Sequence, residues 1–175
     1  MVLKQDIQFQ RIQADELSSL QSFAASTFEY AFAAHNTPED LQEYMTEAFS
    51  TRQMAAELSH PEVYYYFARI GTLIAGYIKL NGTTAQKDLQ DPDALELERI
   101  YVAPEFQNQG IGKYLLEKSV DLAREAGKKY LWLGVWDQNH GAIRFYQRHG
   151  FTKFAMHDFY LGQDRQTDFL MRKDT

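Results

Sequence analysis

The chain of 175 residues contains no cysteine. This absence excludes a disulfide framework, a thiolate metal site and a cysteine nucleophile. The chain also contains only four prolines, and no segment approaches the roughly 20 apolar residues of a membrane span. Its first residues, 1–10, lack the apolar core of a signal peptide. We therefore expect a folded protein of the cytoplasm, with no membrane partner.

Basic residues are in the minority, with 18 Lys and Arg against 24 Asp and Glu and a formal net charge of −6. Nucleic acids and anionic membranes bind basic surfaces, so neither is an expected partner. The net charge lies entirely in residues 1–60, which hold nine acidic and three basic residues, whereas residues 61–175 are neutral. This excess is either a solvated helical surface or a negative rim that attracts a cation.

Length and hydrophobicity favour one domain over residues 1–175, since 45% of the residues are hydrophobic and can fill one core. Asp15 and Thr37 are the expected N-caps of the first two helices. The order of the expected strands and helices along the chain predicts a mixed α/β structure with a strand–loop–helix–strand unit at its centre. The hydrophobic pattern predicts strands near 7–12, 63–70, 73–80, 94–102, 130–136, 151–161 and 168–172, and helices over 16–32, 38–49, 51–59, 110–126 and 139–149.

Two glycines, Gly110 and Gly112, stand where the strand over 94–102 gives way to the following helix. Glycine lets the backbone approach a ligand, and a helix start offers unpaired N–H groups to a phosphate. A P-loop would need glycine in place of Gln107, and a dinucleotide fingerprint would need glycine in place of Leu115. The loop is therefore either a phosphate-binding backbone of another type or a plain helix start.

The segment Gln107-Asn108-Gln109-Gly110-Ile111-Gly112 resembles the acetyl-CoA pyrophosphate loop of the GCN5-related N-acetyltransferases (GNAT). Residues 139–151 resemble the Asn-x-x-Ala-x-x-Phe-Tyr-x-x-x-Gly-Phe segment of the same family at every named position. Residues 27–28, 36–39, 95–101, 132–136 and 166–168 extend the likeness to PaiA-type spermidine/spermine N-acetyltransferases. The resemblance implies a mixed sheet of about seven strands flanked by helices, with residues 1–60 on the acceptor side and residues 61–175 as the cofactor-binding core.

The resemblance also implies that the co-substrate is acetyl-CoA. Asn139 would reach the cofactor arm, cap a helix, or do both. Tyr146 would contact the cofactor and protonate the leaving thiolate, although it could instead be a core aromatic beside Phe145. Backbone groups would hold the pantetheine arm at Ile100, Tyr101 and Val102, and the pyrophosphate at Gln107, Asn108, Gln109, Gly110, Ile111, Gly112 and Lys113.

Glu98 is the expected general base, with Glu96 in reserve, because a carboxylate acting through water can deprotonate an ammonium acceptor. Strand alternation places Glu96, Glu98 and Ile100 on one face, with Arg99 and Tyr101 on the other. The alternative for Glu98 is an ion pair with a nearby lysine or arginine.

Direct attack of the amine on acetyl-CoA in a ternary complex is expected, because no cysteine could carry an acetyl group. The five histidines show no metal-ligand spacing, so no metal is expected. The residues alone leave the oligomeric state open, with a homodimer as one outcome.

The expected acceptor is a small cationic amine, held by the acidic N-terminal helices. Glu29, Glu43 and Glu47 would each meet an ammonium group of a polyamine. Its methylenes and charges would contact aromatic side chains, namely Phe28, Phe32, Tyr44 and Trp136. Two alternatives remain open: acetylation of a protein or peptide amine, and a non-catalytic regulator that binds acetyl-CoA or polyamine.

Overall fold

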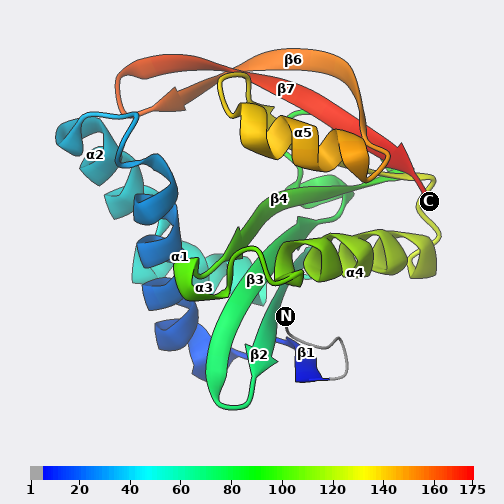
Figure 1. Ribbon diagram of the computed structural model, residues 1–175, viewed down its shortest axis with the longest axis horizontal. Coiled ribbons are helices and arrows are strands. Elements are labelled where there is room, and N and C mark those ends of the chain that lie inside the picture. The colour runs from blue at the N-terminus through cyan, green and yellow to red at the C-terminus, as the bar shows by residue number, and fades with distance from the viewer. Residues whose placement is uncertain (1–5) are drawn as a thin grey trace.

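A computed structural model of the chain describes residues 6–175. One sheet of seven strands, in the order β1-β2-β3-β4-β5-β7-β6, runs through the molecule with helices on both faces (Figure 1). No helix within this described range is both long and apolar enough to cross a membrane. The strands are β1 (Ile7–Arg11), β2 (Val63–Ile70), β3 (Leu73–Asn81), β4 (Ala94–Val102), β5 (Tyr130–Trp136), β6 (Thr152–Leu161) and β7 (Asp164–Asp174). The helices are α1 (Leu17–Phe32), α2 (Pro38–Ala48), α3 (Thr51–Ser59), α4 (Ile111–Glu125) and α5 (His140–Arg148), with 3-10 turns η2 (Ala14–Glu16), η3 (Thr83–Ala85) and η4 (Pro104–Phe106).

The mixed α/β fold and the element order are confirmed, and α3, β2, β4 and β5 have the predicted bounds. Thr37 caps α2 as expected, since its side chain accepts the Asp40 N–H. The expected cap at Asp15 is wrong. Asp15 lies inside the 3-10 turn η2, where Gln13 and Glu16 form a capping box instead.

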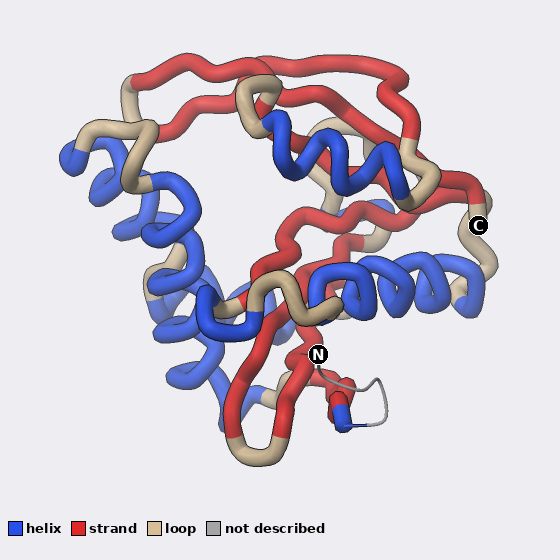
Figure 2. The backbone as a smooth tube through the Cα atoms, viewed as in Figure 1, coloured by secondary structure: helices blue, strands red, loops and turns tan. Residues whose placement is uncertain are grey.

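Strand β4 is the centre of the sheet, because it pairs antiparallel with β3 on one side and parallel with β5 on the other. The parallel pairing covers only the three residue pairs from Ala94–Tyr130 to Glu96–Trp132. Beyond Glu96 the two halves of the sheet separate (Figure 2). The facing edges of β4 and β5 therefore carry backbone N–H and C=O groups without a partner strand.

Two hydrophobic layers sandwich the sheet, and strand alternation sorts the side chains between them. Tyr64, Tyr66 and Ala68 of β2 pack on the side of α4, with Leu115 of that helix. The alternate residues of β2 join the second layer, against α1, α2 and α3. The sheet thus holds the cofactor-motif helices α4 and α5 on one face and the N-terminal helices on the other.

A β-bulge interrupts β4 opposite Lys79 and Leu80, which pair with Arg99 and Leu97 and leave Glu98 as the extra residue. The predicted strict alternation is therefore wrong beyond Leu97, because an extra residue shifts every later side chain to the opposite face. Arg99 lies over the Phe49 ring in the α1–α3 layer, while Ile100 packs with α4. Glu96, Glu98, Arg99 and Tyr101 consequently share one cavity.

Gly76 of β3 lies in close contact with β4 and with α4. A Cβ atom there would lie 2.8 Å from the Tyr101 carbonyl oxygen and 2.9 Å from Cδ1 of Leu115. We expect Gly76→Ala to lower the free energy of unfolding by about 1–3 kcal/mol through overpacking. Gly141→Ala is the matched control, because a Cβ at that helical position meets only Asn139 Oδ1 at 3.8 Å. Urea denaturation curves for both variants test this, and equal stabilities would contradict it.

Candidate active site

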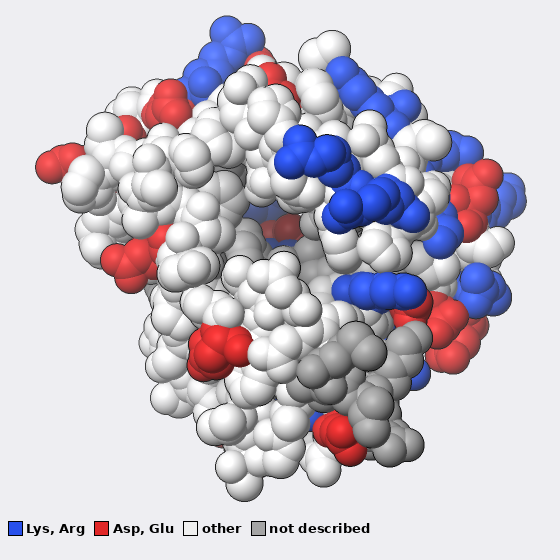
Figure 3. All heavy atoms as spheres, viewed as in Figure 1, with Lys and Arg blue, Asp and Glu red and all other residues white. Residues whose placement is uncertain are grey.

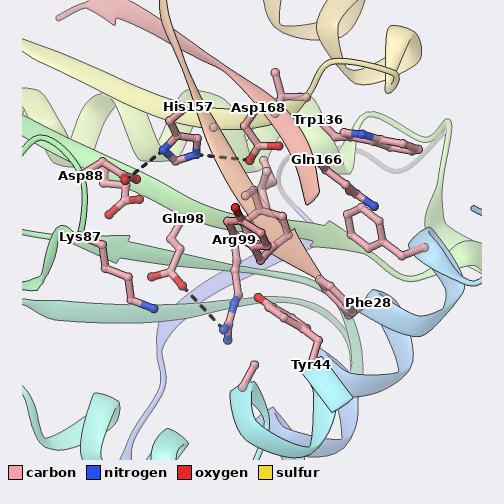
Figure 4. Close-up of a pocket in the computed structure, with 18 of the residues that line it drawn as sticks. Phe28, Tyr44, Lys87, Asp88, Glu98, Arg99, Trp136, His157, Gln166 and Asp168 are labelled. Atoms are coloured by element: carbon pink, nitrogen blue, oxygen red, sulfur yellow. Dashed lines mark ion pairs between the residues drawn. The ribbon is translucent and has the colours of Figure 1, made fainter. Parts of the chain in front are cut away.

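A cavity of about 660 Å³ opens where β4 and β5 separate. Helices α1, α2 and α3 line one side of it, strands β4 to β7 line the sheet side, and Lys87 and Asp88 of the loop after β3 reach its margin (Figure 4). Figure 3 shows a hollow near the middle of one face of the molecule, with acidic and basic atoms at its floor. A concave site thus lies where the two strands diverge.

Carboxylates dominate the charged lining of this cavity. Lys87 and Arg99 are the lysine and arginine among the lining residues, and the imidazole of His157 also lines the cavity. The acidic lining residues are Glu47, Glu57, Asp88, Glu96, Glu98, Asp158 and Asp168. Most of them belong to the electrically neutral residues 61–175, so the charge segregation along the sequence did not indicate them.

Five of the seven predicted acceptor residues line the cavity, namely Phe28, Phe32, Tyr44, Glu47 and Trp136. The Phe28 ring stacks on that of Tyr44 with a centroid distance of 4.8 Å and lies 6.2 Å from that of Tyr101. The rings of Phe28 and Tyr44 form an aromatic wall on the helical side of the cavity (Figure 4), and Tyr101 of β4 adjoins it.

The expectation for Glu29 and Glu43 is corrected, because the structure brings neither to the cavity. Phe28 turns inward, and neighbouring residues on a helix point about 100° apart, so the adjacent Glu29 is exposed to solvent. Glu43 is also exposed and accepts a hydrogen bond from Nε2 of Gln163 at 3.4 Å.

Glu98 lies in a dense ion-pair network. Its Oε2 is 2.6 Å from Nζ of Lys79, which also contacts Glu57 at 3.0 Å, and its Oε1 is 3.7 Å from Arg99. Burial opposes ionisation of Glu98, but the charges of Lys79 and Arg99 outweigh it and lower its pKa to about 2. The ion-pair alternative for Glu98 is therefore present in the structure.

Glu96 lies two residues before Glu98, and its surroundings shift its pKa in the opposite direction. Its carboxylate is buried and accepts a hydrogen bond of 2.9 Å from Nδ2 of Asn81, which also donates to Glu98 at 2.6 Å. Burial, followed by the negative charge of Glu98, raises the pKa of Glu96 to about 7. Two carboxylates two residues apart thus differ strongly in their affinity for a proton.

A second group of titratable side chains, which sequence reasoning did not single out as a site, lies on the sheet side of the cavity. His157 of β6 pairs with Asp168 of β7 in strand register, with 3.7 Å between Nε2 and Oδ2, and its Nδ1 lies 3.0 Å from Asp88 (Figure 4). Burial raises the pKa of Asp168 to about 6, although His157 opposes the rise. Asp168 does lie in residues 166–168, one of the segments that resemble PaiA-type enzymes, and a Cβ at Gly134 of β5 would lie 3.3 Å from its carboxylate.

The loop before α4 has the geometry of an anion cradle. Gly110 adopts a φ of +90° and Asn108 a φ of +60°, and the first helical bond runs from the Tyr114 N–H to the Gly110 carbonyl. The N–H groups of Ile111, Gly112 and Lys113 precede that bond and have no acceptor within the helix. Lys and Arg side chains gather on the face that carries α4 and α5 (Figure 3). The free N–H groups at the start of α4 fit a pyrophosphate, and the unpaired edge of β4 at Ile100 to Val102 fits an amide-bearing arm.

Other parts of the predicted cofactor site serve the fold as well. Asn139 caps α5 by accepting the Ala142 N–H at 3.1 Å, and it also lines the cavity. The side chains of Gln107 and Gln109 donate to the backbone carbonyls of Val102 and Glu105. These contacts pre-form the loop, and ligand contacts from the same residues stay predictions.

Tyr146 lies on the α5 side of the strand divergence rather than among the acceptor-side lining residues. Its ring packs against those of Phe145 and Phe151. Burial raises the pKa of its phenol above the usual value, so the hydroxyl keeps its proton at neutral pH. Burial, followed by the neighbouring phenols of Tyr77 and Tyr44, also raises the pKa of Tyr101 on β4.

Comparison with known proteins agrees with this geometry. The sequence matches the Acetyltransferase (GNAT) family over residues 27–151. An uncharacterised N-acetyltransferase from the pepI 3' region of Lactobacillus delbrueckii subsp. lactis is 38% identical over 163 residues, covering 93% of this chain and 94% of that protein. The spermidine N(1)-acetyltransferase of Thermoplasma acidophilum is 24% identical over 149 residues, covering 83% of this chain and 88% of that protein. The crystal structure of PaiA N-acetyltransferase from T. acidophilum in complex with coenzyme A has a TM-score of 0.77 at 22% identity, covering 97% of this chain and 99% of that one.

The chain therefore belongs to the GNAT family of acetyltransferases. It is an N-acetyltransferase that uses acetyl-CoA as co-substrate, as the sequence predicted. Within residues 6–175, no three His, Asp or Glu side chains are placed to hold a metal ion together.

The raised pKa of Glu96 predicts a pH-dependent stability. The folded state holds a proton on Glu96 up to a pH of about 7, whereas an unfolded glutamate loses it near 4.5, so this residue destabilises the fold increasingly as the pH rises through that window. We expect Glu96→Gln to raise the free energy of unfolding more at pH 8 than at pH 5, by about 2 kcal/mol. Denaturation at both pH values measures the difference, and a pH-independent effect would refute the assigned shift.

Proposed function

We propose that the enzyme acetylates a primary amine of a polyamine such as spermidine. The observation that carries this proposal is the cavity at the strand divergence, with an aromatic wall on its helical side and carboxylates around it. Spaced ammonium groups suit spaced carboxylates, and the intervening methylenes suit rings such as Phe28 and Tyr44. The spermidine acetyltransferase among the relatives supports the same acceptor.

Among the cavity's acids, Glu96 is the best candidate for the proton acceptor, in place of Glu98. A general base works best when its pKa lies near the operating pH, and that of Glu96 is about 7. Glu98, with a pKa of about 2 and two cationic partners, is too weak a base for an ammonium group. In this proposal Glu98 tunes its neighbour, because its charge raises the pKa of Glu96.

Acetyl-CoA supplies the acetyl group as a thioester. The backbone of β4 and of the loop from Gln107 to Lys113 would orient it, with Asn139 beside the arm. Glu96 takes a proton from the acceptor ammonium, directly or through water, so that the amine can attack. A nitrogen–carbon bond then forms as the carbon–sulfur bond breaks, and the Tyr146 hydroxyl gives its proton to the departing sulfur. The nitrogen loses its second proton as it becomes an amide, and this proton returns through water to the Tyr146 oxygen, while Glu96 releases the first proton to solvent. We propose that the enzyme is located in the cytoplasm, and a homodimer is the oligomeric state to be tested.

Thiol release from acetyl-CoA, measured with a panel of acceptors, tests the proposed function. We expect turnover with spermidine and a KM for spermidine that rises with ionic strength, since a charged cavity attracts a cation less strongly at high salt. Glu47→Gln should raise that KM, whereas the matched change Glu29→Gln, outside the cavity, should not.

Tyr146→Phe should lower kcat by about 10²–10⁴-fold. Turnover of peptides without turnover of spermidine would defeat the proposal.

The pH dependence of kcat/KM separates the two glutamates. For the wild type we expect kcat/KM to rise with pH through about 7, as Glu96 becomes ionised. Glu96→Gln should abolish this rise, and Glu98→Gln should move it to lower pH, because the charge of Glu98 raises the pKa of Glu96. A rise that survives Glu96→Gln but disappears in Glu98→Gln would restore Glu98 as the base.

A further inference from the structure

Asn81, the last residue of β3, joins the two glutamates of β4. It lies opposite Glu96 in strand register, next to the bulge that leaves Glu98 as the extra residue. Asn81 is only 2% exposed, and its Nδ2 donates to Oε2 of Glu96 at 2.9 Å and to Oε2 of Glu98 at 2.6 Å. An amide nitrogen carries two hydrogens. This one side chain therefore uses both of its donors on the two carboxylates.

The oxygen of the Asn81 amide has no comparable partner. Oδ1 is buried and accepts no hydrogen bond from any residue that the structure describes. A buried acceptor without a partner lowers stability, and an apolar side chain of the same size would avoid that cost. The hydrogen bonds to the two carboxylates, rather than packing, are thus the reason that an amide suits this position.

The backbone of Asn81 is held in place by the buried side chain of Gln86, which follows the 3-10 turn η3. Nε2 of Gln86 donates to the carbonyl of Asn81 at 3.3 Å and to that of Ala94 at 3.1 Å. Its Oε1 accepts the indole N–H of Trp132 at 3.3 Å. These contacts fix the end of β3 against the start of β4 and against β5, so the Asn81 amide starts from a fixed point.

The charged groups that act on Glu96 are few. They are Glu98 of its own strand, Lys79 of β3 and Asp88 of the loop after β3. Lys79 is shared between Glu98 and Glu57 of α3. The other charged or titratable residues around the cavity lie on α2, the loop after β3, β4 and the C-terminal hairpin, namely Glu47, Lys87, Arg99, His157, Asp158 and Asp168.

Two of these neighbours favour the ionised form of Glu96. The hydrogen bond from Asn81 lowers the pKa of Glu96, and the charge of Lys79 lowers it less. Nζ of Lys79 lies 2.6 Å from Oε2 of Glu98, so this cation is bound to the other carboxylate. The Asn81 amide is consequently the direct partner of the Glu96 carboxylate.

We infer that Asn81 is a positioning residue, which holds the Glu96 carboxylate beside that of Glu98 and sets the pH at which Glu96 becomes a base. This inference rests on the proposed function for the part that Glu96 plays in turnover. Loss of the amide donors makes the ionised form of Glu96 less stable, so its protonated form persists to higher pH. Turnover then requires a more alkaline solution.

Asn81→Leu, which removes both donors at nearly constant volume, tests the inference. Carbon-13 NMR of the side-chain carboxyls, in protein labelled at glutamate, follows the titration of Glu96 without substrate, and Glu96→Gln identifies its signal. We expect the midpoint to rise by about one pH unit in Asn81→Leu, a tenfold change in proton affinity. The rise of kcat/KM with pH should move by the same amount. If Asn81→Leu fails to fold, Asn81→Ser, which keeps a single donor, replaces it and should give a smaller rise.

Gln86→Leu is the matched control, because it removes buried hydrogen bonds from the same end of β3 without touching either carboxylate. It should lower stability and leave the Glu96 midpoint unchanged. An unchanged midpoint in the folded Asn81 variant, or an equal rise in Gln86→Leu, would overturn the inference. A midpoint that moves while kcat/KM keeps its pH dependence would instead defeat only the proposed role of Glu96 in turnover.

Discussion

The separation of β4 from β5 is the constraint on which the rest of the site depends. Only three residue pairs join the two strands. Beyond these pairs, the backbone groups of β4 and β5 lack the hydrogen-bond partners that a fully paired sheet would supply. The open edges suit the amide-bearing arm of the co-substrate, and the cavity at their mouth suits the acceptor. The proposed sites for the two substrates therefore adjoin where the strands part, with Tyr146 on the α5 side of the divergence and the carboxylates on the other side.

The bulge in β4 decides how the carboxylates behave. It turns Glu98 and Arg99 toward the same layer, where Lys79 and Glu57 complete a buried network with matched charges. Buried ion pairs are costly to desolvate, so such a network is weak evidence for stability. Here it holds Glu98 ionised, and the fixed charge raises the pKa of the adjacent Glu96. A single inserted residue thereby produces two carboxylates with different proton affinities.

The acceptor side combines contributions from almost every part of the chain. Helices α1 and α2 supply aromatic rings, the loop after β3 supplies Asp88, and the C-terminal hairpin supplies His157 and Asp168. Hydrogen bonds from the Gln163 N–H to Asp40 and from Gln166 to Asn36 tie the first and last of these parts together. The lining of the cavity is thus distributed over the chain, whereas the glycine-bearing loop before α4 is one local segment.

The sequence alone predicted the element order, the glycine-bearing helix start before α4 and the place of Tyr146 on α5, because these depend on local signals: hydrophobic period, glycines at a helix start and short motifs with fixed spacing. It also indicated the aromatic wall at Phe28 and Tyr44. Only the tertiary structure decided which acids reach the cavity, since Glu29 and Glu43 turn outward while Asp88 and Asp168 turn inward. The same holds for the difference in pKa between Glu96 and Glu98. A bulge and the pKa shifts it causes depend on pairing with β3 and on burial against distant helices, and neither is encoded in the spacing of residues along one strand.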